Sequence, residues 1–307
     1  MKAVVTGGAG FIGSHLVEEL ILQGAEVHVL DNMISGQFQN VHPLAVIHTN
    51  DICSQEAKQI ILREKPDVVF HLAAQADVGR SIREPGYDAD VNINGTINIL
   101  EACRDASVKK MIFASTSGVY GNLQKDLISE EDLTMPISYY GLSKLTAESY
   151  IRLFHQLYGL SYTILRYGNV YGPRQSAKGE GGVIAIFLDR IKKRMPFTIY
   201  GDGEQTRDFI FVKDVVRANI AAVEKGNQKT IQVSTARSTS VNQLVNMLTQ
   251  ISGFPIKAVY THERPGDIKH SCLDNTKARQ LLQWNPKIPI FNGLTETYAF
   301  SNMKDVR

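Results

Sequence analysis

Tyr140 and Lys144 are the residues whose type and spacing most directly suggest chemistry. They stand four residues apart in a segment, residues 139–158, that is predicted to be helical, so both side chains lie on one helix face. A free tyrosine has a pKa near 10 and is only about a thousandth ionised at neutral pH, whereas a nearby ammonium group favours the phenolate. A phenolate can take a proton from a substrate hydroxyl as a general base. The same spacing also occurs in helices that have only a structural role.

Three hydroxyl residues follow the predicted strand over residues 108–114 and offer a partner for this tyrosine. They are Ser115, Thr116 and Ser117. A hydroxyl just past the carboxyl end of a strand reaches the cleft where ligands bind in parallel sheets, and there it can share a hydrogen bond with the reacting oxygen. We assign this part to Thr116. Each of the three could instead cap a turn, and spacing alone does not decide which one faces a substrate.

A second set of residues is typical of a dinucleotide site. Gly7, Gly10 and Gly13 follow the first predicted strand and open the first predicted helix. Such glycines permit a tight turn and let backbone N–H groups approach a pyrophosphate, and the helix N-terminus adds partial positive charge. Asp31 ends the second predicted strand, where a carboxylate can accept hydrogen bonds from the adenosine ribose. Since no arginine or lysine adjoins Asp31 to neutralise a 2′-phosphate, the pattern predicts NAD rather than NADP.

Further cofactor contacts are expected in the glycine loop and at the carboxyl ends of later strands, where ligands bind in such sheets. These residues are Phe11, Ile12, Asn32, Asp51, Ile52, Ala73, Ala74 and Gln75. Their assignment rests on position alone. Loops at strand ends often have only a structural role, which is the alternative for these residues.

The elements that must position these residues alternate between strand-like and helix-like segments. Strands are predicted over residues 2–5, 26–30, 45–48, 67–71, 108–114 and 161–166. Helices are predicted near residues 12–23, 54–64, 86–105 and 139–158. This alternation indicates crossover units and a parallel sheet. The predicted fold class is therefore α/β, with a Rossmann-type doubly wound parallel sheet.

The pattern loosens after about residue 170, where glycine and proline residues punctuate shorter elements. We expect an NAD-binding Rossmann domain over residues 1–170 and a smaller C-terminal α/β lobe for the substrate over residues 171–307, with some segments interleaved. Because the sequence contains no long linker, we expect the two lobes to pack closely around a cleft.

The composition excludes several classes of protein. The 307 residues are 43% hydrophobic and 21% charged, which is typical of a soluble globular chain. A net charge of +2 gives no basic footprint for nucleic acid. Three dispersed cysteines form neither a disulfide framework nor a paired metal motif, which favours a reducing cytoplasm and predicts no metal site. The short apolar run at the N-terminus and the absence of an uncharged apolar stretch of 18 residues predict neither a signal peptide nor a membrane span.

Taken together, the motifs resemble those of the extended short-chain dehydrogenases/reductases, and within them the nucleotide-sugar epimerases of the UDP-glucose 4-epimerase type. In the first half the resemblance is carried by GGAGFIG at residues 7–13, ASTS at 114–117 and YGLSK at 140–144. In the second half it is carried by RYGNVYGPR at 166–174, GDGEQTRD at 201–208 and RPGD at 264–267. Because these motifs occur in the expected order, the resemblance spans nearly the whole chain.

The resemblance implies tightly bound NAD, a UDP-sugar substrate and a homodimer. It makes Tyr140 the base, Lys144 its pKa-lowering partner and a nicotinamide-ribose ligand, and Thr116 the third catalytic member. It adds Asn92 and Tyr167 to the cofactor contacts. The implied substrate contacts are Thr116, Asn169, Arg174, Val183, Thr198, Tyr200, Arg207, Arg264 and Asp267. Of these, Asn169 and two arginines, Arg207 and Arg264, would hold the diphosphate, Thr198 and Tyr200 the uracil, and Asp267 the uridine ribose. The planar fork of an arginine suits phosphate oxygens.

The implied reaction is an oxidation followed by a reduction at the same carbon. Tyr140 removes the O4 proton while the C4 hydride passes to NAD, the 4-keto sugar turns, and the hydride returns to the opposite face. Related 4,6-dehydratases carry two acidic residues directly after the Thr116 position, and related decarboxylases tend to carry Glu at the second of these. Ser117 and Gly118 stand there in this chain, which favours an epimerase over either.

The sequence leaves open both the identity of the sugar and the class of protein. A small residue at Ser271 suggests tolerance of a UDP-N-acetylhexosamine, and Arg174 could pair with the carboxylate of UDP-glucuronate or instead contact the diphosphate or be structural. Another NAD enzyme on the same scaffold, or a nucleotide-sensing protein without catalysis, would share the cofactor motif. The helices near 86–105 and 139–158 could form a subunit interface, although their apolar residues could equally pack against the sheet.

Overall fold

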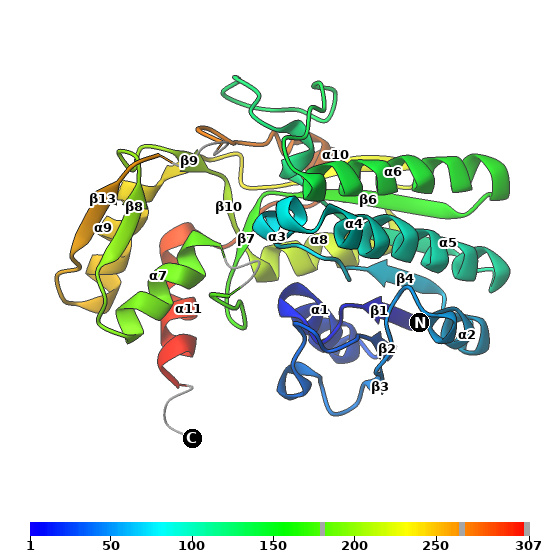
Figure 1. Ribbon diagram of the computed structural model, residues 1–307. Coiled ribbons are helices and arrows are strands. Elements are labelled where there is room, and N and C mark those ends of the chain that lie inside the picture. The colour runs from blue at the N-terminus through cyan, green and yellow to red at the C-terminus, as the bar shows by residue number, and fades with distance from the viewer. Residues whose placement is uncertain (179–181, 264–267, 304–307) are drawn as a thin grey trace.

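A parallel sheet of seven strands forms the centre of the molecule (Figure 1). The computed structural model describes residues 1–178, 182–263 and 268–303. In spatial order the strands are β3 (Val46–His48), β2 (Glu26–Leu30), β1 (Lys2–Thr6), β4 (Val68–His71), β5 (Lys110–Thr116), β6 (Ser161–Tyr167) and β11 (Lys229–Val233). Each neighbouring pair is parallel. The order β3-β2-β1-β4-β5-β6 is that of a dinucleotide-binding Rossmann sheet, and it confirms the predicted fold class and the six predicted strands.

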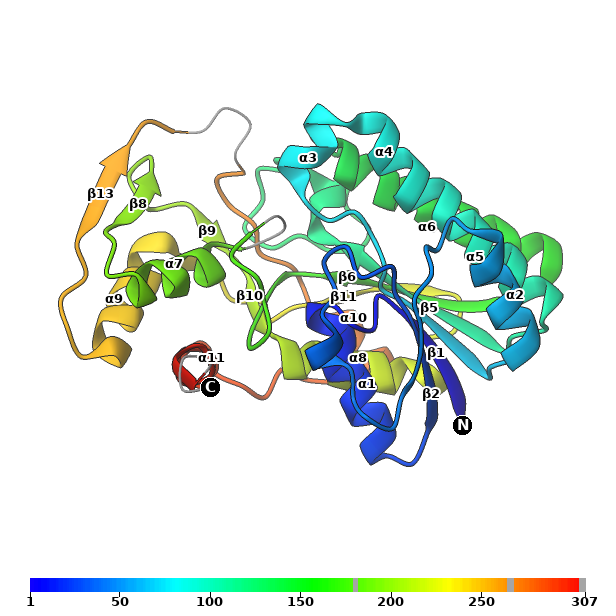
Figure 2. The ribbon, with the colours of Figure 1, turned by 60° about the horizontal axis from the view of Figure 1, so that its bottom comes forward.

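Helices cover both faces of this sheet. Helices α1 (Phe11–Leu22), α8 (Val212–Glu224) and α10 (Thr276–Leu282) share an apolar cluster with one face. Helices α2 (Gln55–Glu64), α5 (Gly95–Asp105) and α6 (Tyr139–Tyr158) share a cluster with the other. Figure 2 shows α5 and α6 above the sheet and α1 and α8 below it. Successive strand residues point to opposite faces, so Val68 and Phe70 belong to the first cluster and Val69 to the second.

The predicted helix near 86–105 is confirmed, although its hydrogen-bonding pattern changes along its length. It consists of α4 (Pro85–Ala89), a π-helical turn (Asp90–Asn94) and α5, and a further short helix, α3 (Val78–Arg83), precedes it. The π turn contains Asn92, whose side chain bonds to the backbone of Gln75 in the loop after β4. A widened turn of this kind is frequent at functional sites.

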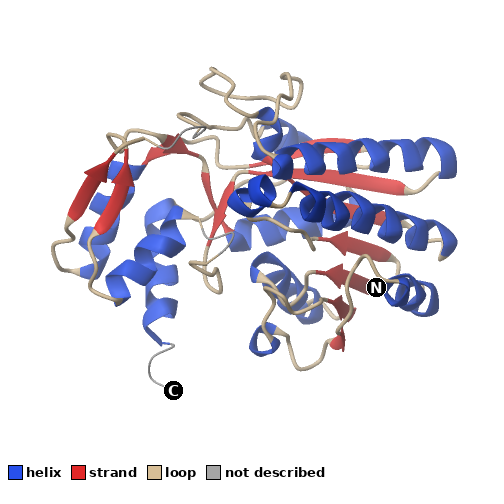
Figure 3. Cartoon of the chain, in the orientation of Figure 1, coloured by secondary structure: helices blue, strands red, loops and turns tan. Residues whose placement is uncertain are grey.

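The C-terminal part lies away from the sheet (Figure 3) and builds an apolar cluster of its own. Its helices are α7 (Val183–Lys192), α9 (Val241–Ser252) and α11 (Ile290–Met303), and the strands β8 (Phe197–Tyr200) and β13 (Ala258–Thr261) pair beside them. Two short strand pairs join this part to the rest, β7 (Asn169–Tyr171) with β10 (Phe209–Phe211), and β9 (Thr206–Arg207) with β12 (Thr239–Ser240). Within the described residues no helix combines the length and the apolar character that a membrane crossing needs.

The chain returns to the central sheet after it has entered the C-terminal part. Strand β11 pairs with β6, and helices α8 and α10 pack in the same apolar cluster as α1. We therefore propose that residues 1–170 together with these returning segments form the NAD-binding part, and that the remainder of residues 171–307 forms the substrate lobe.

Candidate active site

A cavity of about 700 Å³ lies at the carboxyl ends of the central strands. Its walls come from the glycine loop after β1, the loop after β4, the end of β5, the first turn of α6 and the segment that enters α7. Since β1 and β4 are neighbours from which the chain proceeds in opposite directions along the sheet, the cavity occupies the switch point where dinucleotides bind in this architecture.

The glycine loop is shaped for close approach of a phosphate. Gly7 has a φ of +70°, which a residue with a side chain rarely adopts. A Cβ atom on Gly13 would lie 2.1 Å from the carbonyl oxygen of Gly7, so only glycine fits where α1 packs on the loop. Helix α1 begins after Gly10 with no side-chain cap and no acidic residue in its first turn. Its backbone N–H groups and dipole therefore suit a pyrophosphate, and Phe11 and Ile12 complete this wall.

Asp31 closes the far end of this wall. Its carboxylate is buried, and it accepts hydrogen bonds from the backbone N–H of Ala9 at 3.0 Å and of Met33 at 2.9 Å. Burial raises the pKa of Asp31, although these two hydrogen bonds oppose the rise. Asn32 also lines the cavity, and its amide donates to Asp51 at 2.7 Å. Asp51 is not part of the cavity wall, whereas the next residue, Ile52, is.

Asp31→Asn is expected to weaken NAD binding by about 10-fold or more, because a hydrogen bond to a charged group contributes about 1.5–3 kcal/mol. It should also narrow the preference for NAD over NADP, since a 2′-phosphate no longer meets a carboxylate. Calorimetric titration of the apoprotein with each cofactor measures both effects. Asp67→Asn is the control, because Asp67 precedes β4 at the amino ends of the strands, away from the cavity. This variant should bind NAD as the wild type does. Unchanged NAD affinity in Asp31→Asn would contradict the assignment.

A hydrogen-bonded chain holds the loop after β4 in place. The backbone N–H of Ala73 donates to the Thr6 hydroxyl at 3.1 Å, and that hydroxyl lies 2.7 Å from Nδ1 of His71. Nε2 of His71 lies 3.0 Å from the Thr96 hydroxyl, which itself donates to a backbone carbonyl. Burial and the charge of Lys144 lower the pKa of His71 to about 3, so this histidine is neutral and donates from Nε2. The chain fixes Ala73, Ala74 and Gln75 at the cavity wall.

Asn92 lies behind this loop rather than in the cavity wall. Its side chain accepts from the backbone N–H of Gln75 at 2.9 Å and donates to the Gln75 carbonyl at 2.9 Å. It also donates to Ser143, which stands on α6 between Tyr140 and Lys144, at 3.0 Å. Asn92 therefore ties the cofactor loop to the helix that carries the predicted base.

Tyr140, Lys144 and Thr116 all line the same cavity. Helix α6 is capped by Ser138, whose hydroxyl accepts from the backbone of Gly141 at 3.1 Å, so Tyr140 lies in the first turn. The Lys144 side chain is buried, and its ammonium lies 4.5 Å from the centre of the Phe113 ring. Tyr167 forms the wall beside them, and burial, with the nearby Tyr140, raises its pKa.

The three hydroxyls after β5 have different partners. Ser115 donates to the buried carboxylate of Glu148 at 2.6 Å, so its proton is turned away from the cavity. Thr116 lines the cavity and accepts from the backbone N–H of Gly118 at 3.0 Å, where a 3₁₀ turn (Ser117–Tyr120) begins. Ser115 and Ser117 line the cavity as well, but the Ser115 hydroxyl is taken by Glu148. The geometry thus favours Thr116 or Ser117 over Ser115 as the hydroxyl beside Tyr140.

The residues predicted for the substrate are divided between places. Asn169, Arg174 and Val183 line the main cavity. Thr198 on β8, Tyr200 on β8 and Arg207 on β9 are not part of its wall, and Tyr200 instead borders a hollow of about 230 Å³ beside Gln205 and Lys269. Arg264 and Asp267 lie outside the described residues.

Arg174 combines three unusual features. Its φ is +70°, a strained value for a non-glycine residue. One guanidinium nitrogen, Nη2, pairs with Glu18 on α1 at 2.8 Å. The other, Nη1, is buried and has no hydrogen-bond partner among the described residues. A buried donor without a partner indicates a place where a ligand acceptor is expected.

Part of the cavity wall was not predicted from the sequence. Asp77, Arg80, Tyr87 and Lys178 line it. The guanidinium of Arg80 lies over the ring of Tyr87, 4.0 Å from its centre, and pairs with Glu84 at 3.0 Å. Asp77, Arg80 and Tyr87 lie in the segment that follows strand β4, and this position could have indicated them. Helix α3, which carries Arg80, was not predicted.

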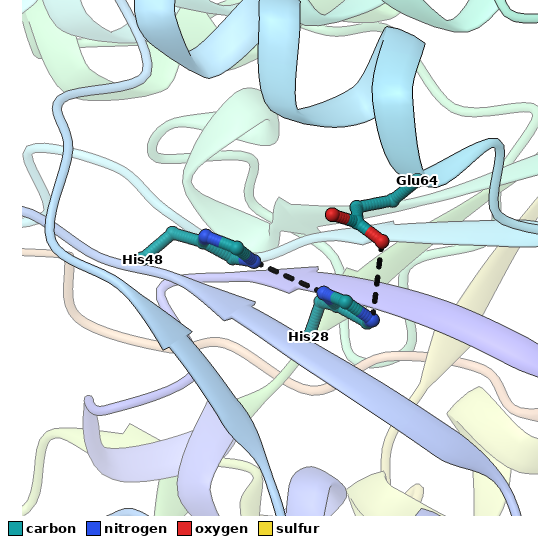
Figure 4. A group of neighbouring side chains, drawn as sticks. All are labelled: His28, His48 and Glu64. Carbon is teal, nitrogen blue, oxygen red and sulfur yellow. Dashed lines mark hydrogen bonds and ion pairs between the residues drawn. The ribbon is translucent and has the colours of Figure 1, made fainter.

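A separate polar cluster of His28 on β2, His48 on β3 and Glu64 on α2 lies outside the cavity wall (Figure 4). Nδ1 of His28 lies 3.0 Å from Nε2 of His48, and Nε2 of His28 lies 3.6 Å from Glu64. Lys2 and Arg63 each approach the Glu64 carboxylate at 2.8 Å and hold the pKa of Glu64 at about 2. With the imidazoles bonded to each other and the carboxylate oxygens taken by cations, the cluster is suited to tying β2, β3 and α2 together rather than to converging on an ion.

Comparison with known proteins agrees with this geometry. The model of the NAD dependent epimerase/dehydratase family matches residues 3–234. The putative UDP-glucose 4-epimerase of Methanocaldococcus jannaschii is 44% identical over 292 residues, which cover 95% of each chain. The structure of Thermotoga maritima UDP-glucose 4-epimerase with UDP-glucose has a TM-score of 0.97 at 45% identity and covers 100% of both chains. The UDP-N-acetylglucosamine 4-epimerase of Methanobrevibacter ruminantium M1 has a TM-score of 0.94 at 37% identity, covering 99% of this chain and 98% of that one. The chain belongs to the NAD-dependent epimerase/dehydratase family.

Proposed function

We propose that this protein is a 4-epimerase of UDP-hexoses, of the UDP-glucose/UDP-galactose type, with Tyr140 as its base. The observation that carries the proposal is one cavity in which Thr116, Tyr140 and Lys144 lie with the glycine loop and Asp31. The similarity to UDP-glucose 4-epimerases at 44% and 45% identity supports this choice of sugar.

The residues present fit NAD as the cofactor. The uncapped start of α1 and the space left by Gly13 would receive the pyrophosphate, and Asp31 the adenosine ribose. When bound, NAD supplies the acceptor and then the donor of a hydride at the sugar C4. Tyr140 takes the proton from O4 and later returns it. An ammonium near the phenol, here that of Lys144, favours its ionised form.

The walls of the cavity agree with an epimerase more than with an elimination enzyme. Among the described residues that line it, the carboxylates are Asp31 and Asp77. Asp31 stands at the cofactor end, and Asp77 caps helix α3 by accepting from the backbone of Arg80 at 3.0 Å. Ser117 and Gly118, directly after Thr116, offer no carboxylate for removing water from the sugar.

A second candidate, a UDP-glucuronate 4-epimerase, is favoured by Arg174. Its unpartnered Nη1 and its place in the cavity wall suit a sugar carboxylate. If this alternative is right, Arg174→Met removes turnover of UDP-glucuronate and leaves that of UDP-galactose.

Incubation of the purified protein with UDP-galactose, UDP-N-acetylgalactosamine and UDP-glucuronate, each followed by NMR, tests the proposal. We expect the highest kcat/KM with UDP-galactose and UDP-glucose as product. A higher kcat/KM with UDP-N-acetylgalactosamine or UDP-glucuronate would show that this sugar, and not UDP-galactose, is the preferred substrate. No 4-epimer from any of them, or a 4-keto-6-deoxy sugar or carbon dioxide, would overturn the proposal.

We further propose that the protein acts as a homodimer in the cytoplasm. Leu142, Leu153 and Leu157 on α6 are about half exposed, at 48%, 48% and 61%, and offer an apolar surface for a second copy. The three cysteines are free thiols, which suits a reducing compartment. Sedimentation equilibrium should give a mass equal to that of two chains. Substitution of Leu153 and Leu157 by charged residues should reduce the measured mass to that of one chain.

A further inference from the structure

Glu148 is a fully buried acidic residue on the helix that carries Tyr140 and Lys144. The three residues are spaced by four, so their side chains share the face of α6 that packs on the sheet. Both carboxylate oxygens are in use. One accepts from Ser115 at 2.6 Å and from Nε of Arg166 at 2.9 Å. The other accepts from Nη2 of Arg166 at 2.7 Å and from Arg152 at 2.6 Å.

This carboxylate is charged despite its burial. Burial alone raises a carboxyl pKa, but the guanidinium of Arg166, the Ser115 hydroxyl and Arg152 lower it, and the net pKa of Glu148 lies below its ordinary value. The paired arrangement with Arg166 is bidentate, which fixes direction as well as distance.

The network continues from Arg166 to the turn that follows β5. Nη1 of Arg166 donates to the Tyr120 hydroxyl at 2.7 Å, and Gln232 on β11 donates to the same oxygen at 2.6 Å. Tyr120 is 1% exposed and ends the 3₁₀ turn whose first backbone amides are capped by Thr116.

Thr116 therefore lies between Ser115 and Tyr120, and both of these residues are bonded to the Glu148–Arg166 ion pair. Ser115 precedes it and bonds directly to Glu148, and Tyr120 ends the turn after it and bonds to Arg166. The same Glu148 belongs to α6, two helical steps of four residues from Tyr140. The ion pair thus links the strand and turn around Thr116 to the helix that carries Tyr140.

We propose that Glu148 is a positioning residue for the reaction, which fixes Thr116 relative to Tyr140 by holding Ser115 directly and Tyr120 through Arg166. This inference rests on the proposed function, and it takes Thr116 as the hydroxyl that shares a hydrogen bond with the sugar oxygen from which Tyr140 takes the proton. Glu148 itself does not line the cavity.

The test compares Glu148→Gln and Ser115→Ala with the wild type on the UDP-sugar that the wild type converts fastest. A misplacement of about 1 Å costs about 100-fold in rate, so kcat of Glu148→Gln should fall by about that factor. KM should change little, because the residues proposed to hold the nucleotide lie on other elements. Ser115→Ala keeps the ion pair intact and should lower kcat by about 10-fold. The double variant should be no slower than Glu148→Gln, because Glu148→Gln already weakens the connection that Ser115→Ala removes.

Asp214→Asn is the matched control. Asp214 is a buried carboxylate on α8 that pairs with Arg217, and no hydrogen bond joins it to Ser115 or Thr116 in the described structure. It should lower Tm and keep the wild-type kcat. If Glu148→Gln and Ser115→Ala also lose only Tm, Glu148 is merely structural and the inference is overturned.

A crystal structure of Glu148→Gln separates this inference from the proposed function. Displacement of Thr116 from Tyr140, relative to the wild type, supports the positioning role whether or not any UDP-sugar is converted. Thr116 in its wild-type place overturns that role. Lack of turnover by the wild-type protein on all three sugars would overturn the proposed function alone.

Discussion

Tyr140→Phe is expected to lower kcat by about 10²- to 10⁴-fold, the usual contribution of a general acid–base group. The substitution removes the hydroxyl and keeps the ring, so the wall beside Tyr167 and Lys144 stays filled. KM for the UDP-sugar should change little, because the phenol acts on the proton that moves in the transition state. Steady-state kinetics with the preferred sugar gives both constants.

Tyr139→Phe is the matched control for this prediction. Tyr139 is the neighbouring residue on α6, is 48% exposed and is not part of the cavity wall. It should retain the wild-type kcat. Wild-type turnover in Tyr140→Phe would show that another group takes the proton and would remove the basis of the assigned mechanism.

Gly13→Ala is expected to yield a protein that purifies without NAD. The added Cβ would lie 2.1 Å from the carbonyl oxygen of Gly7, so the glycine loop must move out of the place where it meets the pyrophosphate. Overpacking of this kind costs about 1–3 kcal/mol, which corresponds to about a 5- to 150-fold loss of affinity. The NAD content of the purified protein and a titration of the apoprotein measure the effect.

Gly86→Ala provides the comparison for the glycine loop. A Cβ on Gly86 meets no atom within 4 Å, and the residue lies in helix α4, where alanine is favoured. It should bind NAD as the wild type does. Full NAD content and unchanged affinity in Gly13→Ala would contradict the placement of the pyrophosphate at the start of α1.

The central sheet could be predicted because its strands are buried on both faces and read as continuous apolar runs. Val4 and Val5 in β1, and Val68 to Phe70 in β4, are examples. The predicted strands and helices then allowed four parts of the site to be predicted, because each lies at a strand end or in a helix next to one. These parts are the glycine loop, Asp31, Thr116 and Tyr140. Their meeting in one cavity is a consequence of the strand order, which alternation of elements indicates.

Contacts between distant segments explain what the sequence did not reveal. Strand β11 has the sequence KTIQV, which is too short and too polar to be distinguished from a loop. The helix near 86–105 contains a π turn where Asn92 bonds to Gln75, and periodicity does not record such a bond. For the same reason the spacing of Tyr140, Lys144 and Glu148 was visible, but the partners of Glu148 on β5 and β6 were not.

The most direct test of the account uses UDP-galactose that carries deuterium at C4. If hydrogen leaves C4 and returns to the same carbon within one closed site, the UDP-glucose formed in ordinary water retains the deuterium at C4. NMR and mass spectrometry of the product measure this retention. Nearly complete retention is the predicted result. Loss of the label to water, with solvent hydrogen at C4 of the product, would contradict the central claim.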